Sequence, residues 1–174
     1  LYFYIMSIED LHNLFKKCSG VSTDSRFIGQ DELFFSLKGP NFNGNNYAKK
    51  AIENGAKYAV VDEKEFAIDE RYIVVKNSLE SLQELSNYHR NKLKVKVIGI
   101  TGSNGKTTSK ELINSVLKTN FKTSFTHGNL NNHIGVPLTL LKITSETEIA
   151  IIEMGANHIG EIALLSKICN PDFG

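Results

Sequence analysis

The sequence lacks three features that would each indicate a different class of protein. Its 174 residues carry a formal net charge of only +1, so there is no basic field to attract nucleic acid. No apolar run approaches the roughly 20 residues that a membrane-spanning helix needs. The two cysteines, Cys18 and Cys169, lie far apart without C-x-x-C spacing, which argues against a disulfide framework or a zinc site. We therefore expect a cytoplasmic protein with reduced thiols, no nucleic-acid partner and no membrane span.

Both ends of the chain stand out. Residues 1–5 read LYFYI and look like the remnant of a protease-cleavage tag, so we expect the native chain to begin at Met6. A signal peptide is excluded because the basic segment that opens one is missing and the apolar stretch is too short. Residues 171–174 could lead into a further strand, and we expect the chain to be part of a longer enzyme.

Hydrophobic patterning divides the chain into two α/β regions, with a boundary expected at residues 92/93. In residues 6–92 we expect helices after the Ser7 cap and near residues 47–54 and 78–91, strands at residues 33–37, 58–61 and 72–75, and loops at residues 21–25 and 41–46. In residues 93–174 we expect strands at residues 96–100, 122–126 and 148–153, and helices at residues 107–117, 136–141 and 160–168. This alternation predicts mostly parallel sheets that bind ligands at the carboxyl ends of their strands.

A glycine-rich turn follows the strand at residues 96–100 and reads GITGSNGKTT over residues 99–108. Glycines allow backbone N–H groups to close around phosphate oxygens, and the following helix N-terminus adds partial positive charge. Lys106 can reach terminal phosphates and the Thr107 hydroxyl can ligate Mg²⁺. The turn therefore predicts a nucleoside triphosphate site, most simply for ATP. Ile100 stands where the general G-x-x-x-x-G-K-[ST] pattern has glycine, so the loop is a variant; the alternative is a turn that merely starts a helix.

Glu153 closes the last predicted strand. An acidic residue there can ligate Mg²⁺ or orient a water molecule beside a phosphate-binding loop, whereas the alternative is a solvent-exposed acid. The asparagine-rich stretch at residues 127–137 should open on the same edge of the sheet. Its amides suit phosphates, carbonyls and sugar hydroxyls, or they cap the next helix. His133 and His158 have no second histidine at ligand spacing, which favours surface positions.

Residues 23–26 read TDSR, a turn former beside a cation that suits an anionic group. Such a group of four polar residues is also ordinary for a loop.

Together these segments resemble the Mur ligase superfamily, in which a shorter phosphate-binding loop explains Ile100. Within it, the motifs TDSR, LFFSLKG, GNLNNHIGVPLTLL and EMGANHIGEI are similar to the members that add D-alanyl-D-alanine to UDP-N-acetylmuramoyl-tripeptide. The resemblance implies a small N-terminal α/β UDP-binding domain followed by the first part of a P-loop ATPase domain, with the C-terminal domain absent. It runs from about Thr23 to Gly174.

The resemblance also implies roles for individual residues. The ATP site would comprise Gly102, Ser103, Asn104, Gly105, Lys106, Thr107 and Thr108. Thr107 and Glu153 would hold Mg²⁺, and Lys106 and Glu153 would act in catalysis. The UDP-muramyl-peptide substrate would contact Ser25, Arg26, Lys38, Asn131 and Asn132. Many relatives have histidine where this chain has Asn45, which leaves base contacts there open.

The implied reaction is ATP-dependent amide formation. A peptide carboxylate attacks the γ-phosphate to give an acyl phosphate, and the amine of D-alanyl-D-alanine then displaces phosphate. Positioning and charge neutralisation suffice for this chemistry, in keeping with a chain that shows no nucleophilic triad. We expect the chain alone to bind the UDP-linked ligand weakly and not to ligate, since a carboxylated lysine and a further metal-binding histidine of the family would lie beyond Gly174.

Three alternatives remain open at this point. Another amino-acid-adding Mur ligase would share most of these motifs. A folylpolyglutamate synthase relative would share the ATPase but lack the first 90 or so residues. A non-catalytic nucleotide-binding module is the third, although the N-K-x-D guanine motif of GTPase switches is missing.

Overall fold

The computed structural model describes residues 6–174, so the expected tag remnant at residues 1–5 lies outside the described residues. The chain divides into two compact units, which meet at Leu85/Ser86 and are described separately. This division falls inside helix α3 (Ser78–Lys92), upstream of the boundary expected at residues 92/93. The last turns of α3 belong to the second unit because their side chains bond to it: the Asn87 amide donates to the carbonyls of Lys167 and Ile168.

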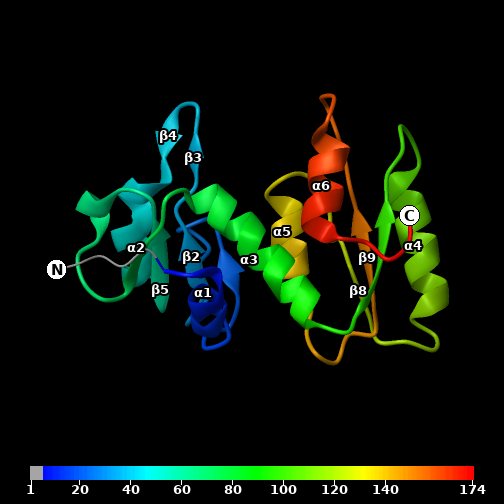
Figure 1. Ribbon diagram of the computed structural model, residues 1–174, viewed down its shortest axis with the longest axis horizontal. Coiled ribbons are helices and arrows are strands. Elements are labelled where there is room, and N and C mark those ends of the chain that lie inside the picture. The colour runs from blue at the N-terminus through cyan, green and yellow to red at the C-terminus, as the bar shows by residue number, and fades with distance from the viewer. Residues whose placement is uncertain (1–5) are drawn as a thin grey trace. The chain divides into compact units, whose positions relative to one another are not determined.

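The first unit is built on a four-stranded parallel sheet (Figure 1). Its strands, in spatial order, are β1 (Val21–Ser22), β2 (Leu33–Phe35), β5 (Tyr58–Val61) and β6 (Tyr72–Val74). Helices α1 (Ile8–Phe15) and α2 (Ala48–Glu53) accompany the sheet, and a short helix, η2, covers Lys64–Phe66. The predicted cap of α1 is confirmed, because the Ser7 hydroxyl accepts from the Asp10 N–H.

Two short elements of this unit differ from the sequence-based expectation. Residues 21–25, expected as a loop, contain β1, whose two residues are too few to produce a visible alternation. Residues 41–46 contribute to an antiparallel hairpin of β3 (Lys38–Gly39) and β4 (Phe42–Asn43), followed by the short helix η1 (Gly44–Tyr47). The Asn43 side chain caps η1 by accepting from the Asn45 N–H, so one asparagine of this segment serves local structure.

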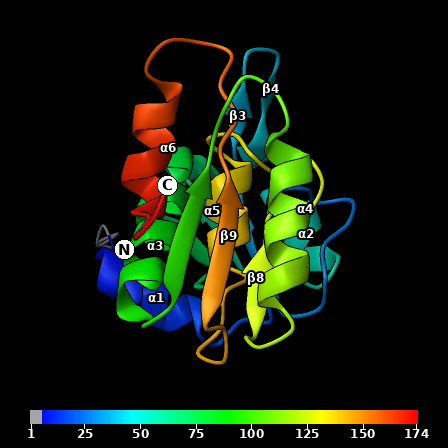
Figure 2. The ribbon, with the colours of Figure 1, turned by 90° about the vertical axis from the view of Figure 1, so that its right-hand side faces the viewer.

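The second unit is built on a three-stranded parallel sheet with helices on both faces. The strands β7 (Lys96–Ile100), β8 (Thr123–Phe125) and β9 (Ile149–Glu153) lie in the order β7-β9-β8, and Figure 2 shows them running in one direction. Helix α4 (Lys106–Leu117) covers one face, and α5 (Gly135–Leu140) and α6 (Glu161–Cys169) cover the other. The expected α/β architecture with mostly parallel sheets is therefore confirmed.

The last residues of the chain extend this sheet beyond β7. Phe173 bridges to Ile98 in parallel, and its carbonyl accepts from the Gly99 N–H at 2.8 Å. The Asp172 carboxylate anchors the segment through Arg90 at 2.7 Å and Lys96 at 3.1 Å. The start of a further strand that residues 171–174 suggested is present in the structure.

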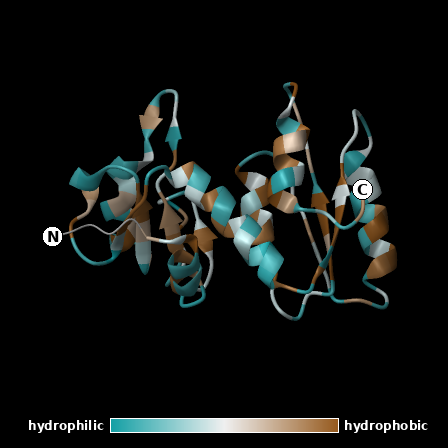
Figure 3. Ribbon diagram, in the orientation of Figure 1, coloured by the Kyte–Doolittle hydropathy of each residue, from teal (hydrophilic) through white to brown (hydrophobic). Residues whose placement is uncertain are grey.

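Each unit has its own hydrophobic core, and the strands of both sheets are largely apolar in Figure 3. Among residues 6–174, we find no helix with the length and hydropathy that crossing a membrane requires. In the second unit the carboxyl ends of β7, β9 and β8 lie along one edge of the sheet, the carboxyl rim. The glycine-rich loop begins at this rim after β7, the asparagine-rich loop begins there after β8, and Glu153 is the last residue of β9.

Candidate functional site

The glycine-rich loop occupies residues 101–105, between the end of β7 and the start of α4. Gly102 has φ +151° and Gly105 has φ +76°, conformations that side chains of L-residues rarely adopt. Within the described chain no side chain caps α4, whose first N–H groups are thus left for water or a ligand. The solvent-exposed residues of the predicted nucleotide site are Gly102, Ser103, Asn104, Gly105, Thr107 and Thr108.

Gly99, the first glycine of the motif, has a different role. It lies inside β7, where a Cβ would come within 2.8 Å of Met154 Cε and 3.2 Å of Pro171 Cβ. A Cβ at Gly105 would meet nothing within 4 Å. The strand glycine therefore permits close packing, whereas the loop glycines permit a backbone turn.

Lys106 is the first residue of α4 and reaches back over the loop. Its ammonium donates to the Gly102 carbonyl at 2.7 Å, and its side chain is partly exposed. The loop backbone, rather than a carboxylate, thus holds this ammonium. A phosphate oxygen could replace that carbonyl without leaving a buried charge unpaired.

Glu153, at the end of β9, is only 2% exposed, so the alternative of a solvent-exposed acid is wrong. Its Oε2 accepts from the Thr107 hydroxyl at 3.1 Å, and its Oε1 accepts from the Asn131 amide at 2.9 Å. Its backbone N–H donates to the Thr126 hydroxyl at 2.9 Å. Each carboxylate oxygen therefore has a partner from another element, which fixes the orientation of the group.

Lys110 is a site residue that sequence reasoning missed. It is 1% exposed, and its ammonium lies 2.7 Å from the Thr126 carbonyl and 3.8 Å from Glu153 Oε2. The partly exposed Glu111 carboxylate lies 3.2 Å away. The only available signal was helical spacing, since a residue four positions after Lys106 occupies the same side of α4. Lys110 supplies a buried positive charge beside the Glu153 carboxylate.

The Thr107–Glu153 pair fits the demands of a magnesium site. Mg²⁺ takes oxygen ligands at about 2.0–2.1 Å in octahedral geometry, so two adjacent ligands lie about 2.9 Å apart. The 3.1 Å between Thr107 Oγ1 and Glu153 Oε2 matches that spacing. Mg²⁺ also keeps several water molecules and shares phosphate oxygens, so two protein ligands are sufficient.

Asn131 and Asn132, the two asparagines predicted to contact substrate, make different hydrogen bonds. The Asn132 carbonyl oxygen accepts from the N–H groups of Ile134 and Gly135, at 3.0 and 2.8 Å, so its side chain holds the turn into α5 as the structural alternative proposed. Asn131 instead points its amide at Glu153. His133 and His158 are both exposed.

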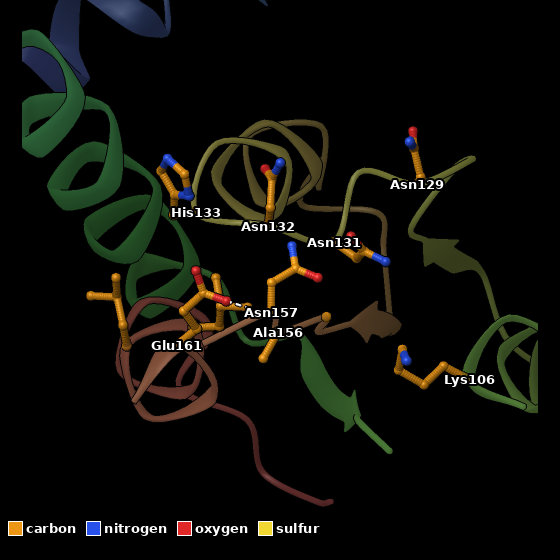
Figure 4. A pocket seen from close by; sticks show the side chains of 11 residues that line it. Lys106, Asn129, Asn131, Asn132, His133, Ala156, Asn157 and Glu161 are labelled. Carbon is orange, nitrogen blue, oxygen red and sulfur yellow. Dashed lines mark hydrogen bonds between the residues drawn. The ribbon is translucent and has the colours of Figure 1, made fainter. Parts of the chain in front are cut away.

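A cavity of about 420 Å³ opens beside these groups (Figure 4). Figure 4 shows Lys106 on its α4 side, with His133 and Glu161 on the opposite side. The Glu161 carboxylate accepts from the N–H groups of Asn157 and His158, which lowers its pKa. The lining is mostly polar and comprises Lys106, Asn129, Asn131, Asn132, His133, Gly155, Ala156, Asn157, Glu161, Leu164 and Leu165.

The first unit has a separate cavity of about 310 Å³ beside the TDSR segment. Ser25 is buried in its wall, whereas Arg26 is exposed and donates to both carboxylate oxygens of Asp24, at 2.9 and 2.6 Å. These hydrogen bonds lower the pKa of Asp24 to about 2. The aromatic rings of Phe42 and Tyr47 are about half exposed and also line the cavity. This site offers a cation and flat apolar surfaces to a ligand.

The structure does not bring Lys38 together with Ser25 and Arg26. The Lys38 ammonium lies 2.9 Å from Asp62 and 2.8 Å from Glu63, and hydrogen bonds to Glu63 and then Asp62 raise its pKa. Asn45 is 1% exposed and bonded to Ser36, Asn43 and Asp62. The side-chain oxygen and amide of Asn45 are therefore occupied in holding η1 against the end of β5. No polar atom of this side chain is free to bind a nucleotide base.

These features define a class of protein: an α/β chain whose second unit gathers a glycine-rich loop, a lysine, a hydroxyl and a buried carboxylate at the carboxyl rim of a parallel sheet. Two family models agree with this description. The Mur ligase family catalytic-domain model matches residues 17–101, and the Mur ligase middle-domain model matches residues 100–174. The chain belongs to the Mur ligase family.

Two sequence relatives share the name of one particular Mur ligase. The UDP-N-acetylmuramoyl-tripeptide–D-alanyl-D-alanine ligase of Bacillus subtilis is 44% identical over 155 residues, which cover 88% of this chain and 34% of the relative. The enzyme of the same name from Escherichia coli is 40% identical over 152 residues, which cover 87% of this chain and 33% of the relative. This chain thus spans about a third of the length of these relatives.

Solved structures show the same likeness. A crystal structure of MurF from Acinetobacter baumannii matches with a TM-score of 0.82 and 34% identity, covering 98% of this chain and 40% of that one. The crystal structure of MurF ligase from Thermotoga maritima in complex with ADP matches with a TM-score of 0.78 and 32% identity, covering 88% of this chain and 36% of that one.

Proposed function

We propose that this chain carries the nucleotide site and the UDP-binding unit of an ATP-dependent ligase that joins D-alanyl-D-alanine to UDP-N-acetylmuramoyl-tripeptide in bacterial cytoplasm. The observation that carries the proposal is the pairing of Thr107 with Glu153 at 3.1 Å, beside Lys106 and the glycine-rich loop. Relatives at 40–44% identity bear the name of this ligase, and the Thermotoga maritima relative was solved with ADP.

In the nucleotide site, the backbone N–H groups of residues 102–108 surround the β- and γ-phosphates. The Lys106 ammonium leaves the Gly102 carbonyl and offsets charge on the γ-phosphate. Thr107 and Glu153 would hold Mg²⁺, which would supply positive charge to offset the charge that develops on the phosphates during transfer. Buried Lys110 balances the carboxylate of Glu153.

Each unit offers a cavity of its own to a ligand. In the first unit, Ser25 and Arg26 hold the diphosphate of the UDP group, and the rings of Phe42 and Tyr47 supply surfaces for the base. In the second unit, the polar cavity beside Asn131 and Asn132 offers donors and acceptors suited to a peptide. Lys38 remains a candidate contact on the β3–β4 hairpin, where it would first have to leave its two carboxylates.

The reaction then needs no covalent intermediate on the protein. The terminal carboxylate of the peptide attacks the γ-phosphorus, the bond to the bridging oxygen breaks, and ADP leaves an acyl phosphate behind. The amine of D-alanyl-D-alanine attacks the acyl carbon, phosphate departs, and the amine loses a proton. The residues of this chain contribute by positioning the phosphates and offsetting their charge.

Ligand-induced stabilisation of the 174-residue chain tests this proposal. A ligand at 100 times its Kd stabilises the folded state by about 2.7 kcal/mol, which is readily measured as a rise in Tm. We expect ATP with Mg²⁺ and UDP-N-acetylmuramoyl-tripeptide each to raise Tm, and GTP with Mg²⁺ to raise it less. Stabilisation by nucleotide but not by the muramyl tripeptide would favour a non-catalytic nucleotide-binding module. A preference for a shorter muramyl peptide would favour an amino-acid-adding ligase.

A further inference from the structure

The contacts of Glu153 raise the question of what fixes its carboxylate before any cation binds. Thr107 donates to Oε2, but a hydroxyl that ligates a cation must turn its lone pairs toward it. Lys110 lies 3.8 Å from Oε2 and gives charge balance without a short hydrogen bond. Within residues 6–174, the remaining hydrogen-bond partner of the carboxylate is the Asn131 amide, at 2.9 Å from Oε1.

Asn131 is attached to the end of β9 at two points. Its side-chain amide donates to Glu153, and its backbone carbonyl accepts from the Gly155 N–H at 2.8 Å. Both bonds join the asparagine-rich loop to the segment that carries the carboxylate. The backbone bond fixes the loop beside the end of β9, and the side-chain bond orients the amide toward Glu153.

Gly155 completes this arrangement through its missing side chain. A Cβ at this position would lie 3.0 Å from both Cγ and Nδ2 of Asn131, closer than ordinary contacts allow. The glycine therefore leaves the space that the Asn131 amide occupies. Gly155 belongs to the EMGANHIGEI motif and Asn131 to GNLNNHIGVPLTLL, so the two motifs meet at this contact.

We infer that Asn131 is the positioning residue that fixes the Glu153 carboxylate for a divalent cation, an assignment that rests on the proposed nucleotide site. By holding Oε1, Asn131 leaves Oε2 directed at Thr107, the other ligand of the cation. Groups that orient a metal ligand in this way contribute about 10- to 100-fold to metal affinity.

The matched control is Asn129. It belongs to the same loop, is exposed and lines the same cavity, yet within residues 6–174 the Glu153 carboxylate accepts hydrogen bonds from Thr107 and Asn131 and not from Asn129. Asn132 is unsuitable because its side chain holds the turn into α5, so its loss would disturb the fold.

The test is calorimetric titration of the 174-residue chain with ADP at a series of MgCl₂ concentrations. For wild type we expect ADP affinity to rise with Mg²⁺. For Asn131→Ala, the Mg²⁺ concentration that gives half of this rise should increase at least about tenfold, with ADP affinity in EDTA unchanged. Asn129→Ala should behave as wild type. Asn131→Ser should shift in the same direction and serves if the alanine variant unfolds.

The outcomes distinguish a failure of the proposed metal site from a failure of the positioning role of Asn131. If wild type shows no Mg²⁺ dependence, the proposed metal site fails and the role of Asn131 fails with it. If wild type responds but Asn131→Ala and Asn131→Ser respond identically, only the positioning role is overturned. An equal loss of ADP affinity with and without Mg²⁺ would also overturn it, because general damage to the loop produces that pattern.

Discussion

The candidate sites of the two units are stabilised in contrasting ways. At the carboxyl rim of the second unit, Thr107 and Glu153 are 46 positions apart and lie within hydrogen-bond distance, with Lys110 buried behind them. In the first unit, the exposed Arg26 pairs with Asp24, only two residues away. The first arrangement depends on the packing of the whole unit, whereas the second is a local turn.

Because of this difference, we expect mutations in the two units to have different consequences for stability and ligand binding. A buried group held by several elements is already oriented for a ligand, so its removal affects stability as well as binding. An exposed local pair must open when a ligand binds, and its opening costs little in water. Stability and affinity should therefore change together for the buried rim residues Glu153 and Lys110, and independently for more exposed groups such as Lys106 and the TDSR segment.

The largest expected effect is that of Lys110→Met. The substitution keeps the methylene packing but leaves the buried Glu153 carboxylate without its cation, and breaking a buried pair in this way costs about 3–5 kcal/mol. Urea unfolding of the chain would measure the loss. Lys118→Met, an exposed lysine at the end of the same helix, is the control and should change stability by less than about 0.5 kcal/mol. An unchanged unfolding free energy in Lys110→Met would contradict the proposed charge balance.

Lys106→Met should separate binding from stability within the same helix. Within residues 6–174, the Lys106 ammonium hydrogen-bonds only to the exposed Gly102 carbonyl, so its loss should leave the unfolding free energy nearly unchanged. Loss of a hydrogen bond from a charged group costs about 1.5–3 kcal/mol, so the affinity for ATP with Mg²⁺ should fall roughly 10- to 100-fold. Calorimetry checks the affinity, and wild-type affinity in the variant would show that Lys106 does not contact the nucleotide.

The glycines of the loop motif give a third contrast. Gly99→Ala places a methyl group 3.2 Å from Pro171 Cβ as well as 2.8 Å from the flexible end of Met154, and should cost about 1–3 kcal/mol of stability through overpacking. Gly105→Ala meets no neighbouring atom, but its φ of +76° costs about 1–2 kcal/mol for a residue with a side chain. We expect unfolding experiments to rank Gly99→Ala as the less stable, and nucleotide titrations to rank Gly105→Ala as the weaker binder. The reverse ranking in both would refute the division of roles.

The sequence predicted the rim well because parallel topology fixes what meets there. Alternating strands and helices place the carboxyl ends of β7 and β9 on one edge, and this alone brings Thr107 near Glu153. The contacts of Lys110 were not predictable in the same way. Its spacing puts it on one side of α4, but only the packed structure shows that this side faces Glu153.

Adjacent asparagines show the limit of pattern reading most clearly. Asn131 and Asn132 have the same chemistry and neighbouring positions, yet one bonds to Glu153 and the other holds the turn into α5. A change of one position decides the role, and composition carries no information about it. Lys38 is a similar case, since its ion pairs with Asp62 and Glu63 depend on a hairpin that the sequence did not reveal.

The smallest expected effect concerns the Asp24–Arg26 pair. Its carboxylate has a pKa of about 2 instead of 3.8, so the pair is intact at neutral pH and is lost only as the pH falls through about 2. If the diphosphate of UDP takes Arg26 from Asp24, the Asp24 pKa should rise toward 3.8 on UDP binding, which carbon-detected NMR titration would show. By the same logic Asp24→Asn frees Arg26 and should strengthen UDP binding by less than about fivefold.

Asp69→Asn is the matched control for this last measurement. Asp69 pairs with Arg71 at the same two-residue spacing and with the same 2.6 Å contact between the guanidinium and the carboxylate, but neither residue lines the cavity beside Ser25. Its removal should leave UDP affinity unchanged. Equal gains from both variants would mean that UDP responds to overall charge, whereas a loss in Asp24→Asn would mean that Asp24 positions Arg26 for the ligand rather than competing for it.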